Sequence, residues 1–492
     1  TGLKKYFCDY ESFGNTGLEK GDNLLDTLVN GGIFIDAPCG GMGKCGKCRV
    51  HINGVGDRLA CVEKVSGNME IVIESTENKI LTDGIVRKAE FTADGYGIAV
   101  DIGTTTIAAA LVDLKIGKII DTRADLNYQK SYGADVISRI SYCIDNSDGL
   151  NTLQKCIVNQ LDGIINNLMY TNDIKKIDKA VIVGNTTMLH ILLGKNPIPL
   201  SVSPFTPQFT SSQKINSAEL GFIENFELIT LPIASAYIGA DTISAMLACS
   251  MDKSDKPAML IDIGTNGEMV IGDIKNGFFS CSVAAGPAFE GAHIECGTGS
   301  IPGAIDSVTL HDGIAEISTI GQKTSVGICG SGLIDTVAEF LKNNIITQTG
   351  EFFKTPVWSK YICNNSFILS RKVKITQQDI REVQLAKSAF SVGIDILLEK
   401  SALTPSELAT VFLAGGMGTY IDKSNTAEIG IYPHEFVSKA VSCGNAALSG
   451  AVSVLIDKKL LENANMLCSK IQNIELANYE NFEQMYIERL NF

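Results

Sequence analysis

Residues 98–118 read IAVDIGTTTIAAALVDLKIGK, and residues 259–277 read MLIDIGTNGEMVIGDIKNG. Each stretch has an apolar run, the turn Asp-Ile-Gly-Thr, a second apolar run, and then an Asp followed by a Lys-containing turn with Gly. Short apolar runs bounded by such turns are typical of buried strands. Because the two copies lie about 160 residues apart, they predict a duplicated β-hairpin, one in each half of a large domain, rather than a repeat array.

Helical segments are expected between these strands. Residues 376–379, Thr-Gln-Gln-Asp, have the pattern of a capping box, with the acid three residues after the capping threonine. Apolar residues then recur at helical spacing, namely Ile380, Val383, Phe390, Ile394 and Leu397. Residues 411–414 return as an apolar strand that ends at the glycine turn of residues 415–418. The alternation of strands and helices predicts an α/β fold.

The duplicated turns carry residue types that bind nucleotides. A strand that ends in Asp-x-Gly-Thr offers a carboxylate to Mg²⁺ or its waters, and backbone N–H groups and hydroxyls to phosphate. One such turn is a weak signal, but two copies and a glycine turn, where the backbone can approach a base or ribose, are strong together. They predict that ATP and Mg²⁺ are bound by Asp101, Gly103, Thr104, Thr105, Thr106, Asp262, Gly264, Thr265, Asn266, Gly415, Gly416, Met417 and Gly418.

Four cysteines near the start of the chain form a second motif. Residues 39–48 read CGGMGKCGKC, which places Cys39, Cys45 and Cys48 in one glycine-rich loop, and Cys61 follows. A [2Fe–2S] cluster requires four thiolates. The alternative is a structural zinc site, which commonly uses two pairs of cysteines two residues apart. Only one such pair is present, so we predict the iron–sulfur cluster.

Residues 1–80, which contain these cysteines, predict a small α+β module. Asp22 can cap a short helix over residues 23–30, and residues 49–53 and 69–74 alternate as strands do. Residues 81–96 are polar and weakly patterned, so a linker is expected there. The large domain should then occupy residues 97–492, in two subdomains over 97–235 and 236–492.

These features together resemble the superfamily of actin, sugar kinases and acetate kinase. The first hairpin is similar to its phosphate-1 motif, the second to its phosphate-2 motif, and the glycine turn to its adenosine motif. Residues 181–187 and 326–335 fall where that superfamily has connecting hinge segments, and they add Gly330 and Ser331 to the expected nucleotide-binding residues. The resemblance implies a duplicated ribonuclease-H-like ATPase domain, preceded here by a small β-grasp ferredoxin domain.

A closer resemblance is to the reductive activators of corrinoid-dependent enzymes, which join a [2Fe–2S] domain to such an ATPase domain. It rests on GNTTMLH (184–190), DIGTNGE (262–268), AAGPAFEGAHI (284–294), GICGSGLID (327–335), DIREVQLAKSA (379–389) and AGGMG (414–418), and covers essentially the whole chain. Many members insert a further domain between the two parts, but the linker here is too short for one. Some relatives carry C-terminal [4Fe–4S] motifs, whereas only Cys468 lies near the end of this sequence.

This second resemblance implies a function. The cluster would pass one electron to Co(II) of a corrinoid protein in a methyltransferase system and so restore Co(I), with ATP hydrolysis resetting the complex. An upstream reduced ferredoxin or flavoprotein would supply the electron, in anaerobic one-carbon metabolism, and a homodimer is left open. The alternatives are an ATP-driven electron donor to another low-potential metalloenzyme, a metabolite kinase with a redox-regulatory ferredoxin domain, and an actin-like assembly protein.

Catalytic roles are expected for three acidic residues. Asp101 and Asp262 would supply charge to the metal ion or its waters, and Glu290 would orient the attacking water, with Glu268 and Asp241 as alternatives.

Three basic residues and the single tryptophan also require an interpretation. His190 is expected to be a hydrogen-bonded structural residue, while His293 lies in a glycine-rich loop and keeps a functional alternative. Lys387 could reach the nucleotide from its helix, although a solvated lysine is the simpler expectation. Trp358 is expected to pack in a core.

The composition excludes several classes of protein. The 492-residue chain has a net charge of −14, so it lacks the basic surface that nucleic-acid binding needs. It has no run of roughly 18 apolar residues, and residues 1–6 carry no apolar stretch typical of a signal peptide. Fourteen cysteines in a chain of this length do not suggest a disulfide scaffold. We therefore expect a cytoplasmic protein without nucleic-acid or membrane partners.

Overall fold

The computed structural model of the chain describes residues 2–8, 21–30, 33, 35, 37, 41, 43, 48–66, 69–75, 94–353 and 355–492. The chain divides into two compact units. Unit 1 comprises Thr1–Glu77, Lys88–Asp241 and Ala451–Asn465, and unit 2 comprises Asn78–Arg87, Thr242–Gly450 and Met466–Phe492. In the described part of the chain, no helix combines the length and the apolar character that crossing a bilayer would need.

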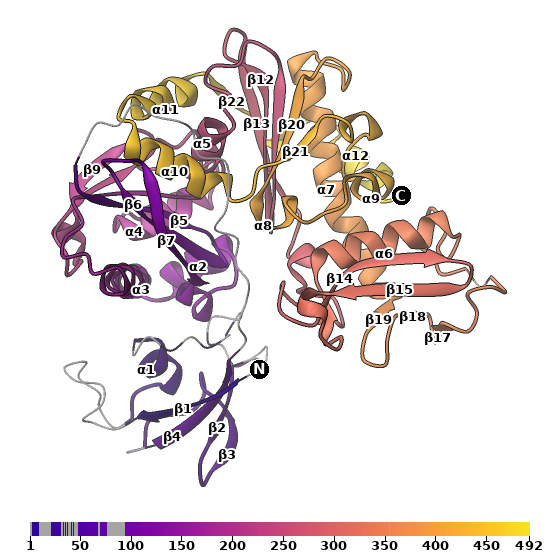
Figure 1. Ribbon diagram of the computed structural model, residues 1–492, viewed down its shortest axis with the longest axis horizontal. Helices are drawn as coiled ribbons and strands as arrows, with labels where there is room; N and C mark the ends of the chain where they lie inside the picture. The colour runs from indigo at the N-terminus through magenta and orange to yellow at the C-terminus, as the bar shows by residue number, and fades with distance from the viewer. Residues whose placement is uncertain are drawn as a thin grey trace. The chain divides into compact units, whose positions relative to one another are not determined.

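The N-terminal part of unit 1 is a four-stranded sheet with one short helix, α1 (Leu24–Asn30) (Figure 1). Its strands are β1 (Gly2–Cys8), β2 (Arg49–Ile52), β3 (Gly56–Leu59) and β4 (Met69–Ser75), in the antiparallel order β1-β4-β2-β3. Leu24 and Leu28 of α1 are buried, as are Ile52 and Ile71 of the sheet. The helix cap was predicted one residue too early. Asn23, not Asp22, accepts the hydrogen bond from the backbone N of Leu25, at 2.9 Å.

The larger sheet of unit 1 contains the first predicted hairpin. Its strands are β5 (Tyr96–Ile102), β6 (Thr106–Asp113), β7 (Lys118–Leu126), β8 (Lys179–Gly184), β9 (Gln213–Asn216) and β10 (Glu227–Thr230), in the order β7-β6-β5-β8-β10-β9. Strands β5, β6 and β7 form an antiparallel meander, while β8 runs parallel to both β5 and β10. The hairpin register pairs Ile102 with Ile107, so the predicted turn lies directly between β5 and β6.

The sheet of unit 2 repeats this plan around the second hairpin. Its strands are β11 (Ala258–Ile263), β12 (Asn266–Asp273), β13 (Gly277–Ala284), β20 (Thr410–Ala414), β21 (Ala440–Ser442) and β22 (Ile471–Asn473), in the order β21-β20-β11-β12-β13-β22. Again an antiparallel meander is continued by two parallel strands on the side of its first strand. The duplication predicted from the sequence is therefore present in the fold.

Helices alternate with the strands in both units, as the sequence pattern predicted (Figure 1). They are α2 (Val136–Asp145), α3 (Gly149–Thr171), α4 (Thr186–Leu192), α5 (Ala240–Ala248), α6 (Gly330–Lys342), α7 (Gln377–Ser401), α8 (Gly415–Gly418), α9 (Lys423–Glu428), α10 (Ala446–Ile456), α11 (Lys459–Ser469) and α12 (Phe482–Glu488). Helix α7 packs against β12 and β13. It begins with the predicted capping box, since Thr376 and Asp379 exchange backbone-to-side-chain hydrogen bonds of 2.8 and 3.2 Å. Its five predicted apolar positions are all fully buried.

Two small sheets complete unit 2. One has the order β15-β14-β16, with β14 (Ala304–His311), β15 (Ile314–Thr319) and β16 (Gly327–Ile328), and α6 packs on β14. The other has the order β17-β18-β19, with β17 (Ile362–Cys363), β18 (Ser366–Ile368) and β19 (Lys374–Thr376). Trp358 is buried in the core of this unit, with its ring centroid 6.2 Å from that of Phe367. Its predicted role in packing is confirmed.

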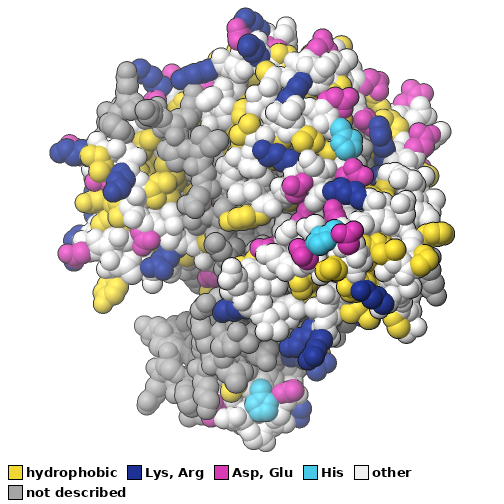
Figure 2. Space-filling view, turned by 45° about the vertical axis from the view of Figure 1, so that its right-hand side comes forward, with side chains coloured by type: hydrophobic (Ala, Val, Ile, Leu, Met, Phe, Trp, Pro, Cys, Tyr) yellow, Lys and Arg dark blue, Asp and Glu magenta, His cyan; other side chains and the backbone are white. Residues whose placement is uncertain are grey.

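The charged side chains are mixed on the surface. On the face drawn in Figure 2, acidic and basic groups alternate among the described residues without a continuous basic stripe.

Candidate functional site

Three polar side chains of unit 1 donate hydrogen bonds to the first Asp-Ile-Gly-Thr turn. Asn127 donates from Nδ2 to the carbonyl of Gly103 at 2.9 Å, and Asn185 donates from Nδ2 to Thr104 Oγ1 at 3.0 Å. The guanidinium of Arg139 donates to the carbonyl of Thr104. These contacts fix the turn on its protein side, while residues 103–106 stay partly exposed.

Gly103 is required by this geometry. A Cβ atom at this position would lie 2.7 Å from the carbonyl oxygen of Thr106, which is closer than nonbonded atoms approach. Asp101 is the last residue but one of β5, next to the turn, and is partly exposed. The turn therefore presents a carboxylate and hydroxyls together, which are the groups that the predicted Mg²⁺ and phosphate contacts need.

The second turn, in unit 2, is tied to Glu290. Both the backbone N and Oγ1 of Thr265 donate to Glu290 Oε1, at 2.9 and 2.5 Å. Glu290 ends the 3-10 helix η4 (Ala288–Glu290). The structure thus brings one predicted catalytic acid to the turn that begins with Asp262. Glu268, the alternative acid of this unit, lies opposite Asp262 in the register of β11 and β12.

The glycine turn lies against the same aspartate. Gly415 has φ +84°, in the region that favours glycine, and a Cβ atom there would collide with Asp262 Oδ1. At Gly416 a Cβ atom would meet nothing within 4 Å, so the turn is open on that side. Asp262, Thr265, Glu290 and Gly415 are therefore neighbours in unit 2, although they span more than 150 residues of sequence.

Gly330 and Ser331, two of the expected nucleotide-binding residues, begin α6. The Ser331 hydroxyl donates to the carbonyl of Asp306 at 2.9 Å and is buried. Within unit 2 this side chain therefore fastens α6 to β14. The side chain of Met417 lies outside the described residues, and its predicted contact with nucleotide stays a prediction.

The three polar contacts of the first turn, made by Asn127, Asn185 and Arg139, were missed by the sequence reasoning. Asn185 also caps α4, accepting from the backbone N of Met188 at 3.0 Å, and it lies in the Gly-Asn-Thr-Thr segment that follows β8. A polar residue at the end of a buried strand was the available signal. For Arg139 no signal existed, because a lone arginine in an amphipathic helix is usually a surface residue.

Of the two histidines singled out from the sequence, His190 has a structural role. His190 is fully buried and hydrogen-bonded at both ring nitrogens: Nδ1 donates to the carbonyl of Thr186 at 2.7 Å and Nε2 accepts from the backbone N of Gln208 at 3.0 Å. The structural interpretation of His190 is confirmed. His293 is exposed, with Nδ1 3.9 Å from a carboxylate oxygen of Glu382.

Lys387 contradicts both sequence-based interpretations. It is buried and donates to the carbonyl of Asn491, and its Nζ lies 5.5 Å from the ring centroid of Phe492. Burial lowers the pKa of its ammonium group to about 8, and the neighbouring charge of Arg489 acts in the same direction. Lys387 is thus neither solvated nor directed at a nucleotide turn, because its long apolar stem is used to anchor the C-terminal segment.

Two of the four candidate cluster ligands lie in the described chain. Cys48 precedes β2 and Cys61 follows β3, and the β2–β3 hairpin brings their Sγ atoms to 3.2 Å, with side chains 1% and 8% exposed. Two thiolates that share a metal ion, each about 2.3 Å from it, lie within about 4 Å of each other. The pair therefore fits a common metal. Cys39 and Cys45 lie outside the described residues, among which no group of three metal ligands occurs.

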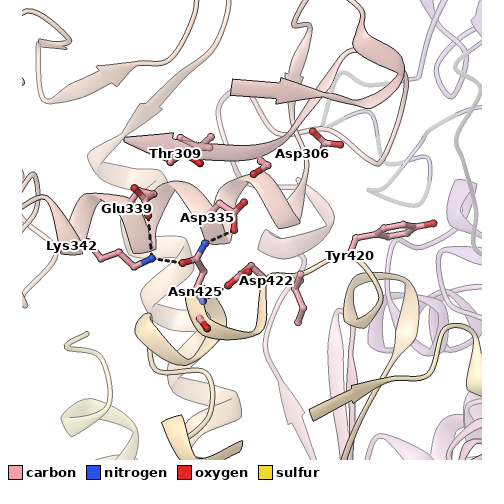
Figure 3. Close-up of a pocket in the computed structure, with 12 residues that line it drawn as sticks. Asp306, Thr309, Asp335, Glu339, Lys342, Tyr420, Asp422 and Asn425 are labelled. Carbon is pink, nitrogen blue, oxygen red and sulfur yellow. Dashed lines mark hydrogen bonds and ion pairs between the residues drawn. The ribbon is translucent and has the colours of Figure 1, made fainter. Parts of the chain in front are cut away.

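Unit 2 also contains a polar pocket of about 570 Å³, lined by residues of β14, α6 and α9 and of the segment between α8 and α9. Figure 3 shows Asp335 and Lys342 pointing from α6 toward Asn425 of α9. Asn425 donates to Asp335 at 2.7 Å and accepts from Lys342 at 2.6 Å. Burial raises the pKa of Asp335. None of the predicted site residues lines this pocket.

Comparisons with known proteins agree with this geometry. Residues 96–254 match the family described as the RACo middle region, and residues 256–492 match the C-terminal domain of RACo, the ASKHA domain. The chain belongs to the RACo family. Its expected actin and sugar-kinase type of fold is confirmed, and so is the resemblance to the reductive activators.

Named members of the RACo family are similar over most of their length. The corrinoid activation enzyme RamQ of Eubacterium limosum is 28% identical, over 95% of this chain and 96% of the relative. The [Co(II) methylated amine-specific corrinoid protein] reductase of Methanosarcina barkeri is 24% identical, over 81% of this chain and 77% of the relative. A solved structure named as a reductive activator for corrinoid, iron-sulfur protein matches with a TM-score of 0.74 and 26% identity, over 96% of both chains.

A short part of this RACo-family chain has a different relative. Over 70 residues it is 41% identical to one of the subunits of the Na⁺-translocating NADH-quinone reductase of Klebsiella pneumoniae, a match that covers 10% of this chain and 17% of that protein.

Proposed function

We propose that this chain is an ATP-dependent reductive activator that passes one electron from an N-terminal [2Fe–2S] cluster to Co(II) of a corrinoid protein and so restores Co(I) for methyl transfer. The observation that carries the proposal is the repeated turn. In both units an Asp-Ile-Gly-Thr turn follows the first strand of the meander, in a family whose relatives are named for corrinoid activation.

Mg²⁺-ATP would be bound by the two turns and the glycine turn. The residues assigned are Asp101, Gly103, Thr104, Thr105 and Thr106; Asp262, Gly264, Thr265 and Asn266; Gly330 and Ser331; and Gly415, Gly416, Met417 and Gly418. Support comes from the partly exposed side chains of both turns and from the packing of Gly415 against Asp262. Each aspartate would contribute negative charge to the metal ion or to its water shell.

Glu290 is assigned as the acid that orients the attacking water. Its carboxylate is fixed by two hydrogen bonds from Thr265, so it cannot turn away from the phosphate-2 turn without losing both. A fixed carboxylate beside the phosphates is the arrangement that water positioning requires.

The cluster would be held by Cys39, Cys45, Cys48 and Cys61. Support comes from the buried Cys48 and Cys61 thiols at the base of the β2–β3 hairpin. When bound, a plant-type cluster supplies a one-electron carrier with a potential near about −400 mV. About 2.3 kcal/mol corresponds to ~100 mV for one electron, so a few kcal/mol of differential binding to a ligand-altered state of the cobalt would close the gap between the potential of the cluster and that of the bound Co(II).

The remaining parts of the proposal concern organisation. A ferredoxin-like domain would occupy residues 1–80, a linker 81–96 and the ATPase domain 97–492, with subdomains over 97–235 and 236–492. A reduced ferredoxin or flavoprotein would reload the cluster, in the cytoplasm. The partner would be the corrinoid protein of a methyltransferase system, as the names of the relatives suggest.

The experiment mixes the protein anaerobically with a Co(II) corrinoid protein, a reductant and Mg²⁺-ATP, and follows the corrinoid absorbance. Asp101→Ala and Asp262→Ala should each slow Co(I) formation at least tenfold, which corresponds to about 1.4 kcal/mol in the barrier. The matched control is Asp113→Ala, at the end of β6 away from the turn, where the side chain accepts from the backbone N of Lys115 at 2.9 Å; this variant should keep the rate of the wild type. Co(I) formation that needs no ATP, or phosphorylation of a small hydroxylated metabolite instead, would contradict the proposal.

A further inference from the structure

The short 3-10 helix η1 (Tyr128–Ser131) of unit 1 is attached at its N-terminal end to the first phosphate turn. The capping residue Asn127 is fully buried. Its side chain donates to the carbonyl of Gly103 at 2.9 Å, and its backbone N donates to the carbonyl of Thr105 at the same distance. Two carbonyls of the turn are thus fixed by the residue that begins η1.

The other end of η1 is attached to the cysteine-bearing module. Ser131 is fully buried and donates from Oγ to the carbonyl of Ile35 at 2.6 Å. Ile35 is itself buried and lies four residues before Cys39 in the sequence. The following residue, Tyr132, is buried within electrostatic range of Asp26 of α1. The backbone that leads into the cysteine loop is therefore bonded to η1.

The middle of η1 is held by buried groups of α2 and α3. Gln129 is fully buried, donates to the carbonyl of Leu153 in α3 at 2.9 Å and accepts from Arg139 at 3.3 Å. Arg139 also donates to Thr104 of the phosphate turn. Since η1 spans four residues and its interior is hydrogen-bonded to α3 and α2, its two ends cannot shift independently.

We infer that η1 couples the phosphate-1 turn to the cysteine-bearing module, so that nucleotide binding at residues 103–106 changes the stability of the segment that leads into Cys39. The inference deepens the proposed function and rests on it. Coupling between two binding sites is reciprocal. Loss of the cluster must therefore change the affinity for nucleotide by the same factor by which nucleotide changes the affinity for the cluster.

The experiment measures amide hydrogen exchange of the full chain with its cluster, with and without a non-hydrolysable ATP analogue and Mg²⁺. In the wild type, the nucleotide should slow exchange in residues 21–37 at least threefold. Ser131→Ala removes the hydroxyl that bonds Ile35 and should abolish this response. The rate at which a chelator removes the cluster should likewise depend on nucleotide in the wild type and not in Ser131→Ala.

Ser217→Ala is the matched control. Ser217 is also a fully buried serine of unit 1 in a 3-10 helix, η3 (Ser217–Leu220), and donates to a backbone carbonyl, that of Glu224, at 2.7 Å. Its hydroxyl also accepts from the backbone N of Phe226, so its bonds join segments distant in sequence from the turn and from the cysteine module. This variant should therefore keep the nucleotide response. An unchanged response in Ser131→Ala, or its loss in both variants, would overturn the inference.

Nucleotide binding is titrated separately. This titration distinguishes failure of the coupling from failure of the proposed function. Binding without any change of exchange in residues 21–37 overturns the coupling alone. Absence of binding overturns the proposed function and the coupling with it.

Discussion

At the scale of single residues, Arg139 has the most unusual environment in the described chain. Its guanidinium is fully buried, has no carboxylate within ion-pair distance among the described residues, and donates to the carbonyls of Gly133 and Thr104 and to Gln129. Burial lowers its pKa to about 10, so it stays charged at neutral pH. Such a cation is stable only while its hydrogen bonds persist.

Replacement of Arg139 should therefore be costly. Arg139→Met leaves the carbonyls of Gly133 and Thr104 without their donors, and we expect the free energy of unfolding to fall by about 3 kcal/mol. Arg123→Met, at a half-exposed arginine of β7, is the control and should change it by less than about 0.5 kcal/mol. Urea unfolding measures both. A loss below about 1 kcal/mol for Arg139→Met would mean that the buried network contributes little.

His190 gives a prediction of pH dependence. Burial lowers the pKa of its imidazole below the usual 6.5, so the unfolded chain takes up a proton that the folded chain does not. The unfolded state then binds more protons as the pH falls below about 6.5, and the free energy of unfolding decreases. His190→Asn removes this contribution. Between about pH 7 and pH 5.5 its stability should fall less steeply than that of the wild type, and equal slopes would contradict the assignment.

Single residues could be predicted from the sequence where their pattern occurs in few structural environments. The aspartates, glycines and threonines of both turns could be named because few other environments repeat that pattern. Arg139 and the hydrogen bonds between Glu290 and Thr265 could not be derived, since they depend on segments that only the tertiary fold brings together. Lys387 was misjudged for the same reason: the C-terminal segment that buries it is distant in sequence.

At the scale of elements, the glycine turn α8 offers the sharpest prediction. Gly415→Ala would push a methyl group against Asp262 Oδ1, so we expect Mg²⁺-ATP affinity to fall at least tenfold, about 1.4 kcal/mol. The control is Gly321→Ala, at a glycine with φ +69° and nothing within 4 Å of its Cβ position. Both variants carry the strain of a left-handed alanine, about 1–2 kcal/mol in stability.

Nucleotide titration and urea unfolding together separate the two effects. Gly321→Ala should lose stability and keep its affinity for nucleotide, because it lies outside both turns. An unchanged affinity of Gly415→Ala for Mg²⁺-ATP would show that close contact between residue 415 and Asp262 does not affect nucleotide binding.

Elements with strong periodicity were predictable from the sequence. The two hairpins follow from short apolar runs bounded by turns, and α7 follows from apolar residues at helical spacing. The capping box of α7 was found at the predicted residues. The helix cap of α1 was misplaced by one residue because Asp22 and Asn23 are both good capping residues.

At the scale of the whole molecule, the chain returns to its first unit near its end. Residues 451–465 belong to unit 1, and Leu455 packs where a Cβ atom on Gly97 of β5 would lie, at 2.9 Å. Leu455→Ala should therefore destabilise unit 1 by about 3 kcal/mol or more. Leu397→Ala, at a fully buried position in α7, is the matched control in unit 2.

Amide hydrogen exchange measures the effect of both variants on the two sheets. Leu455→Ala should speed exchange in β5 and leave β11 protected, and Leu397→Ala should do the reverse. The same pattern in both variants would contradict the division into two units. This return of the chain was not predicted, because the amphipathic pattern of a helix does not reveal which of two similar sheets it covers.

The central claim is that an electron leaves the cluster of this chain for a corrinoid under the control of ATP. The most direct measurement starts with the protein reduced, excess reductant removed, and a Co(II) corrinoid protein added anaerobically, while electron paramagnetic resonance follows the cluster and absorbance follows the corrinoid. The account predicts that with Mg²⁺-ATP one Co(I) appears for each cluster oxidised, and that Cys48→Ser yields none. Co(I) that appears while the cluster stays reduced, or in equal yield from Cys48→Ser, would contradict it.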